Sequence, residues 1–334
     1  MLCRTSTGSL PGSGPIAPRR TAPPAARGRI DRTVPTGPTA LTDPSAPSDR
    51  SLRSVRSFRT TRRRRLTDSR SAGRVINLRR ARGVAVLAAP LAFLFSSQAP
   101  ADTQPEIRFL PAYFSGDFGT GISTATTYLP LIFILGSSRQ EARLTVPFLS
   151  VTTSQPVTFV GHEIIPRGTG GRTSESGIGD VVAQEEYFFL EGGRRRPWIS
   201  GLFRIKVPTA DDTRGLGTGE WDYGPGAALI QPLGAKWNLL GEAQYILRGD
   251  PPGRDFRNTW WLSGGLQKKL SGSTSASLYY ERLQSVLPGR PDLVDLIVGY
   301  DHSFARRLTL RTSVFVGLSE SAEDYGLSAG FSLR

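Results

Sequence analysis

The sequence contains very few residues of the types that build redox and metal sites. Its 334 residues include one cysteine, Cys3, and two histidines, His162 and His302. A single cysteine excludes an internal disulfide framework, and the usual zinc ligand sets need more Cys and His than the chain holds. We therefore expect neither a metal nor a cofactor.

Long apolar runs are also missing from most of the chain. After residue 101 there is no stretch of 18 or more apolar residues, so we expect no transmembrane helix in this part. Glycines are numerous, and aromatic residues are spread through the C-terminal two thirds. This composition is typical of many short strands joined by turns.

Positive charge is concentrated in the first third of the chain. Residues 1–101 hold 19 Lys and Arg against 4 Asp and Glu, whereas residues 102–334 hold 23 against 24. The segment 1–78 is rich in Arg, Pro and Ser and buries too little apolar surface to offset the entropy of ordering. We predict a disordered extension, or sequence upstream of the true start. A nucleic-acid or anionic-lipid arm is the alternative, but we expect no nucleic-acid partner.

Residues 79–101 have the three parts of a secretory signal peptide. A basic stretch that begins at Arg79 precedes a twelve-residue apolar core, 84–95, and a small-residue motif ends at Ala101. The core is too short to span a bilayer. A buried helix of a soluble domain is the alternative. We predict export and cleavage after Ala101, with a signal that is internal as the sequence is written.

Residues 102–334 alternate between apolar and polar side chains. In 307–318, Leu308 and Val314 fall on one face and Thr309 and Arg311 on the other. A soluble antiparallel barrel or sandwich would alternate in the same way. Strand lengths of about ten residues, the signal peptide and charges in the middle of strands favour a transmembrane barrel.

We therefore predict an all-β fold, a transmembrane antiparallel up-and-down β-barrel over 102–334 in the outer membrane of a Gram-negative envelope. Short connections alternate with longer ones, and the short ones are expected on the periplasmic side, together with both termini. The first two strands alternate poorly, so ten strands is the alternative to twelve. The twelve predicted strands are 106–115, 122–134, 140–152, 178–190, 197–208, 221–232, 236–248, 258–270, 274–286, 292–304, 307–318 and 323–333.

The alternation also predicts which polar side chains line the barrel interior. Both signs of charge occur on neighbouring strands, which indicates a salt-bridged, hydrated lumen and fixes no ionic selectivity. The candidate lumen-facing residues are Arg143, Asp180, Glu186, Arg204, Lys206, Glu242, Gln244, Gln267, Glu281, Asp295, Asp301 and Arg311.

Charged residues also gather in two of the longer connections. One interpretation is a polar gate at the outer mouth, and the one we favour is ordinary turn chemistry with ion pairs between loops. The candidate gate residues are Asp211, Asp212, Arg214, Asp222, Asp250 and Arg254.

Aromatic residues near strand ends predict two interfacial girdles. The periplasmic girdle would hold Trp198, Trp237 and Tyr300, and the outer girdle would hold Trp221, Tyr223, Trp260 and Tyr325.

An ordered set of turns at 177–181, 207–223 and 247–253, with strand residues at 143–150 and 324–327, resembles a known family. It is similar to the outer-membrane transporters named after the MetA pathway of phenol degradation, over roughly 107–333. The resemblance implies an envelope barrel that passes small, hydrophobic or aromatic molecules, and it supplies no catalytic residues. The expected partners are outer-membrane lipid, the barrel-assembly machinery and a small-molecule solute.

The chain departs from such barrels at its last residue. They usually end on an aromatic residue that the assembly machinery reads, whereas this sequence ends at Arg334, with Phe331 three residues earlier. A missing final residue or a weaker insertion signal would explain the difference.

Two other classes of protein are open. An outer-membrane hydrolase of the lipase or esterase kind would need a serine or aspartate beside a histidine at the outer rim. His302 is predicted at the periplasmic end, and His162 lies in the long connection 153–177, where we expect it to be solvated. We therefore do not expect this protein to be an enzyme. The second class is a structural envelope barrel with a plugged lumen.

Overall fold

The computed structural model describes residues 103–168, 170–304 and 307–334. The predicted extension and signal peptide lie outside the described residues. Within those residues, no helix could cross a membrane.

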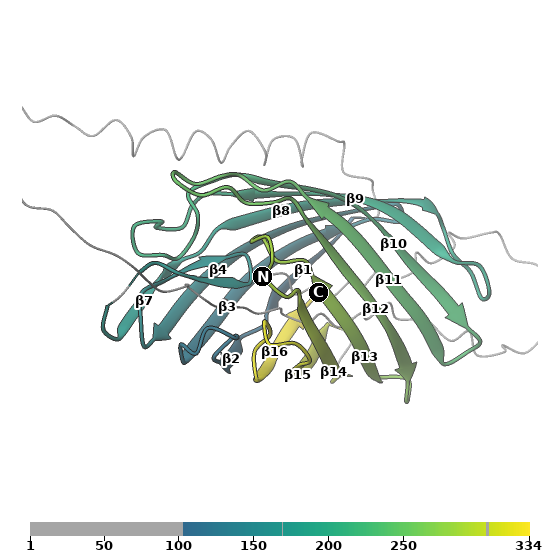
Figure 1. Ribbon diagram of the computed structural model, residues 1–334. Helices are drawn as coiled ribbons and strands as arrows, with labels where there is room; N and C mark the ends of the chain where they lie inside the picture. Colours follow the sequence, from purple (N-terminus) through teal and green to yellow (C-terminus); the bar gives the residue numbers. More distant parts are fainter. Residues whose placement is uncertain (1–102, 169, 305–306) are drawn as a thin grey trace, which may run out of the picture.

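One antiparallel sheet closes on itself to form a barrel (Figure 1). Strands β1 and β2 are two halves of one barrel strand, because both pair with β3 and with β16. Strands β7 and β8 are likewise two halves of another, since both pair with β4. The barrel therefore has twelve strands, and the pairing of the first with β16 leaves no free edge. Their bounds are β1 (Gln104–Phe109), β2 (Ala112–Gly116), β3 (Thr124–Gly136), β4 (Gln140–Thr153), β7 (Thr173–Ile178), β8 (Val181–Leu190), β9 (Trp198–Val207), β10 (Asp222–Leu233), β11 (Trp237–Ile246), β12 (Thr259–Lys269), β13 (Thr274–Leu283), β14 (Leu293–Ser303), β15 (Leu308–Gly317) and β16 (Tyr325–Leu333).

The predicted twelve-stranded antiparallel barrel is confirmed, with two local differences. The first strand breaks at Pro111, which has no N–H to donate to a strand ladder. The fourth begins earlier than the predicted residue 178, because β7 (Thr173–Ile178) begins in the predicted connection 153–177 and pairs with β4. It breaks between Ile178 and Val181, where the N–H of Gly179 donates to the carbonyl of Pro147 at 2.9 Å.

Alternation along the strands separates an apolar outer surface from a buried inner one. On β14, Val298 is 50% exposed whereas its neighbour Ile297 is completely buried, and on β16 Leu327 is 52% exposed. Exposed Leu, Val, Ile and Phe side chains recur in this way on all sides of the barrel. A soluble monomer rarely exposes an apolar area of this extent, so the outer band fits hydrocarbon.

Most of the predicted girdle residues lie on the outer surface, but Trp198 does not. Trp237, Tyr300, Trp260 and Tyr325 are between 41% and 48% exposed. The prediction for Trp198 is wrong: its side chain is 4% exposed and packs edge-on against Phe188 inside the barrel, with ring centroids 6.2 Å apart. It shares the inward face of β9 with Arg204, as the alternation requires.

The connection between β4 and β7, expected to be a loop, contains two further strands. Strands β5 (Val157–Val160) and β6 (Glu163–Pro166) form a separate two-stranded hairpin. Its turn passes through Gly161, whose φ of 67° is easily adopted only by glycine. Because this hairpin lies outside the barrel sheet, it is held by contacts to other outer connections instead of by the barrel ladder. We call β5 and β6 the lid.

Candidate functional site: the enclosed interior and its outer lid

The structure places all twelve predicted lumen residues inside the barrel, and it encloses them tightly. Eleven of them are less than 10% exposed, and the side chain of Asp180 is 11% exposed. Asp295 is completely buried. These lumen side chains are therefore shielded from solvent in this structure.

Near the periplasmic end, the buried charges form pairs. Arg311 donates to Asp301 at 3.0 Å, and Arg108 pairs with Glu106, which also accepts from Arg334 at 2.7 Å. The last contact joins the C-terminal residue to the first strand beside the seam that closes the barrel.

Several buried charges were not among the predicted lumen residues, and four of them are Glu106, Arg108, Glu141 and Arg248. Glu106 and Arg108 lie on the first strand, whose alternation is poor, and Glu141 pairs with Arg143 on β4. In each of these pairs the two residues are two positions apart, so both side chains face inward from one strand. That i, i+2 spacing of opposite charges is the signal in the sequence that could have identified them. The fourth, Arg248, pairs across strands and gives no such signal.

A second charge network lies toward the outer end. The Lys206 ammonium is 3.3 Å from Asp180 and 3.2 Å from Asp222, and Arg248 donates to Asp222 at 2.9 Å. The placement of Asp222 in an outer-loop gate is therefore wrong. Asp222 is the first residue of β10, is 4% exposed and faces the interior, because two basic side chains bind it there.

The other candidate gate residues lie in the outer connections. Asp211 and Asp250 fix local turns: Asp211 accepts from the N–H of Thr213 at 3.1 Å and Asp250 from that of Phe256 at 2.8 Å. The side-chain hydrogen bond from Thr213 holds the pKa of Asp211 below its usual range. Asp212 is exposed.

Arg214 and Arg254, by contrast, make contacts between connections. Arg214 pairs with Glu175 of the barrel wall at 2.7 Å, and Arg254 donates to the carbonyl of Pro166 in the lid at 3.0 Å. The candidate gate residues therefore have different roles. Asp211 and Asp250 form turns, and Asp222 lies in the lumen. Arg214 contacts the barrel wall and Arg254 contacts the lid.

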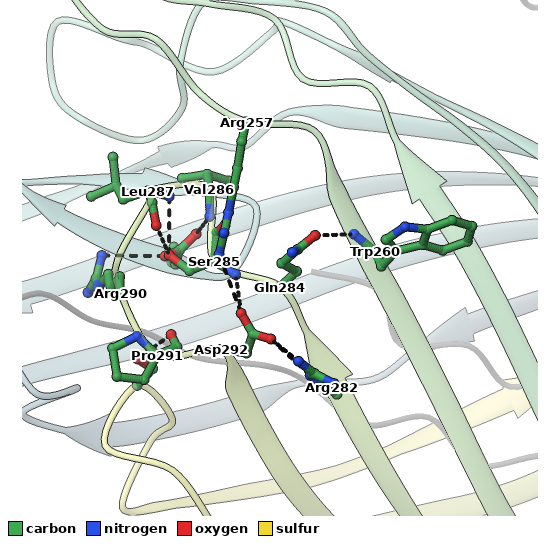
Figure 2. A network of polar contacts seen from close by, with 12 residues as sticks. Arg257, Trp260, Arg282, Gln284, Ser285, Val286, Leu287, Arg290, Pro291 and Asp292 are labelled. Atoms are coloured by element: carbon green, nitrogen blue, oxygen red, sulfur yellow. Dashed lines mark hydrogen bonds and ion pairs between the residues drawn. The ribbon is translucent and has the colours of Figure 1, made fainter.

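The end of the lid is fixed by one buried carboxylate. Glu163 is completely buried and accepts hydrogen bonds from the Ser285 hydroxyl and, at 2.7 Å, from the N–H of Val286. Arg290 adds a contact to Glu163 at 3.4 Å and donates to the carbonyl of Ile164 at 3.3 Å. Figure 2 shows Ser285, Val286 and Arg290 gathered on the connection between β13 and β14. Burial raises the pKa of Glu163, although Arg290 opposes that shift.

The rest of the lid is attached to two further outer connections. The N–H of Phe159 donates to the carbonyl of Gly215 at 2.8 Å, and Arg167 donates to that of Thr213 at 2.9 Å. Val160 and Ile165 of the lid form an apolar cluster with residues of two different connections, Phe256 and Val286. Contacts to three separate connections place the lid across the outer mouth of the barrel.

A pocket of ≈ 320 Å³ lies between the lid and the barrel wall. Its apolar lining includes Val151 of β4, Val157 of the lid and Leu216, and its charged lining includes Arg214 and Glu175. A pocket of this size is within the range of small-molecule sites.

The two histidines lie at opposite ends of the barrel. His302, near the short turn after β14, has its Nδ1 2.9 Å from the Thr274 hydroxyl. His162 was expected to be solvated, and this is wrong, because it is 6% exposed at the turn of the lid. Across the residues that the structure describes, no three His, Cys, Asp or Glu side chains are grouped so as to hold a metal ion.

Comparison with known proteins agrees with this architecture. The family model described as "Putative MetA-pathway of phenol degradation" matches residues 117–334. No match is found among curated proteins. The COG4313 outer membrane channel from Pseudomonas putida F1 is similar in structure, with 17% identity, a TM-score of 0.50, and coverage of 69% of this chain and 94% of that chain.

Weaker structural likenesses occur to two further barrels. The KdgM porin has 10% identity and a TM-score of 0.43, covering 69% of this chain and 98% of its own. The CymD monoaromatic hydrocarbon channel has 8% identity and a TM-score of 0.39, covering 69% and 87%. The likeness to the COG4313 channel shows that the fold is that of an outer-membrane β-barrel.

Proposed function

The chain belongs to the family described by the MetA pathway of phenol degradation, and from this premise we propose that it is an outer-membrane channel for small solutes. The observation that carries the proposal is the closed barrel itself. An apolar band faces outward, charged and polar side chains face inward, and a lid that is not part of the barrel sheet lies across the outer mouth.

The enclosed interior limits the solute. Since the lumen residues are buried, only a small molecule that displaces a few side chains and the lid could pass. The outer half of the interior also contains an apolar cluster, in which Phe315, Ile297 and Leu293 are completely buried together with the lid residue Ile164. We therefore propose small solutes with an apolar or aromatic part. We expect no catalytic activity, and the similar structures are described as channels and porins.

A structural envelope barrel with a plugged lumen is the second candidate, and the burial of the lumen residues is the observation that favours it. Reconstitution distinguishes the two. The folded protein in planar bilayers and liposomes should give discrete conductance steps and admit small solutes such as phenol or benzyl alcohol. Heat-denatured protein is the control. A plugged structural barrel would pass neither ions nor solutes, and that result would reject the proposed channel.

A further inference from the structure

Three carboxylates meet at the outer end of the barrel interior. Glu281 on β13 and Asp295 on β14 lie directly opposite each other, and Asp295 is paired on its other side with Gly317 of β15. The connection after β15 folds inward over that glycine and brings Glu323 to Asp295. A Cβ atom on Gly317 would lie 2.0 Å from the Glu323 carbonyl oxygen, so a glycine is required there. We call Glu281, Asp295 and Glu323 the acidic trio.

Two members of the acidic trio have no partner in the described part of the chain. Asp295 is 0% exposed and Glu323 is 1% exposed, and none of their four carboxylate oxygens has a hydrogen-bond partner. When both are ionised their charges repel each other, and an ionised Glu281 adds to the repulsion on Asp295. A buried carboxylate normally needs a paired charge or several donors. Without such a partner among the described residues the two carboxyl groups hold protons, and a cation that enters the site would take the place of those protons.

The buried basic side chains nearby are already engaged. Arg290 binds the lid through Glu163, and Lys206 lies between Asp180 and Asp222. Moving either to the acidic trio would leave another buried carboxylate without its ion pair. Neither of these side chains is therefore available to Asp295 or Glu323, whose counter-charge would come from a solute.

Aromatic side chains adjoin the acidic trio. Tyr279 and Phe315 are the next inward-facing residues on β13 and β15, and they are 3% and 0% exposed. The ring of Phe114 packs edge-on against Phe315, with centroids 5.5 Å apart. Aromatic faces attract organic ammonium groups, and their apolar area binds an attached hydrocarbon.

We propose that the acidic trio binds the ammonium group of a small protonated amine, whose apolar body packs against Tyr279, Phe114 and Phe315. This inference rests on the proposed function in one respect: the amine is one of the solutes that enter under the lid. It assigns a chemical class, organic cations, that the sequence alone did not.

The first test measures binding and does not depend on conduction. Benzylammonium chloride is titrated calorimetrically into the folded, detergent-solubilised barrel, with benzoate and benzyl alcohol as probes of similar shape but different charge. The double variant D295N/E323Q keeps the side-chain volumes and removes both charges. The matched control is D324N, which neutralises the exposed carboxylate next to Glu323.

We expect the parent protein and D324N to bind benzylammonium with similar affinity and D295N/E323Q to bind it roughly tenfold more weakly or worse. Benzoate and benzyl alcohol should bind far less. Equal binding in D295N/E323Q, or equal binding of all three probes, overturns the inference. If the parent protein binds no probe because the closed lid excludes it, the same titrations are repeated with the Glu163→Ala substitution added to each variant. Should the double variant not fold, E323Q alone supplies the comparison.

The second test separates this inference from the proposed function. Reversal potentials in a potassium chloride gradient should show cation preference in the parent channel and a clear loss of it in D295N/E323Q. Amine binding without any conductance would reject the channel and keep the amine site. Conductance with neither amine binding nor cation preference would reject the amine site and keep the channel.

Discussion

Replacing Glu163 with alanine should loosen the lid. In the parent protein this carboxylate, fully enclosed, accepts from Ser285 and from the N–H of Val286 and lies 3.4 Å from Arg290. The substitution removes all three interactions and leaves the Arg290 guanidinium, itself 3% exposed, without its carboxylate. Removing one member of a buried ion pair typically costs about 3–5 kcal/mol.

This cost destabilises the closed state of the lid. When the lid opens, Arg290 and the Val286 N–H can reach water, so most of the penalty disappears. Taking ~3 kcal/mol as the lower value, the ratio of open to closed lid should rise by about 10²-fold. The backbone contact between Phe159 and Gly215 and the apolar cluster around Phe256 are retained, so the barrel should stay folded.

Two assays measure this shift. In planar bilayers the fraction of time in the open state should rise steeply in E163A. In detergent, trypsin should cleave after Arg167, an exposed residue that follows β6, much faster in E163A than in the parent, because cleavage follows the population of the open form.

The matched control is Glu175→Ala, which removes a carboxylate paired with Arg214 at a similar place in the barrel but with side chains 37% and 44% exposed. Exposed pairs contribute about 0–1 kcal/mol, so this variant should change either readout less than about fivefold. Opening and cleavage in E163A that match the E175A values would refute the assignment of Glu163 as the residue that holds the lid.

Three further predictions concern stability, each measured as the urea midpoint of unfolding in detergent. Without a bound amine, burial raises the pKa of Glu323 from 4.5 to about 8, and the titratable group that faces it is Asp295. The folded state therefore keeps a proton that the unfolded chain releases, so the free energy of unfolding should fall as pH rises from 5 to 8. The fall should reach up to ~1.4 kcal/mol per pH unit. The same pH dependence in E323Q would contradict the assignment of this proton to Glu323. Gly317→Ala should destabilise the barrel by roughly 2 kcal/mol or more because its Cβ would meet the Glu323 carbonyl, whereas Gly272→Ala, with nothing within 4 Å, should be close to neutral. Asp301→Ala should lower the free energy of unfolding by about 3–5 kcal/mol, because it leaves Arg311 buried without its carboxylate. A decrease below about 1 kcal/mol would show that the periplasmic pair is hydrated.

The sequence was sufficient to predict the barrel because a period of two governs most of the spanning strands. The predicted strand 307–318 matches β15 (Leu308–Gly317), and the inward and outward faces follow from alternation alone. Trp198 shows which rule is stronger. Its alternation with Ile199 placed it inside, its position near a strand end suggested a girdle, and the structure follows the alternation.

The lid and the charge pairing could not be predicted in this way. Strands β5 and β6 have four residues each, too few for a period to stand out, and Glu163 has the sequence context of a solvated loop charge. Partners such as Lys206 and Asp222 depend on the register between two strands, which the sequence does not fix. Glu323 lies in a connection, and only its folding over Gly317 brings it to the acidic trio.

A channel of this kind requires a closed, membrane-embedded ring of strands. Fractionation of the producing cells, followed by gel electrophoresis of boiled and unboiled samples, tests this in one measurement. A closed barrel should be found in the outer-membrane fraction and should migrate differently before boiling, because its paired strands resist detergent at room temperature. A protein found in the soluble fraction, with the same mobility before and after boiling, would contradict the account.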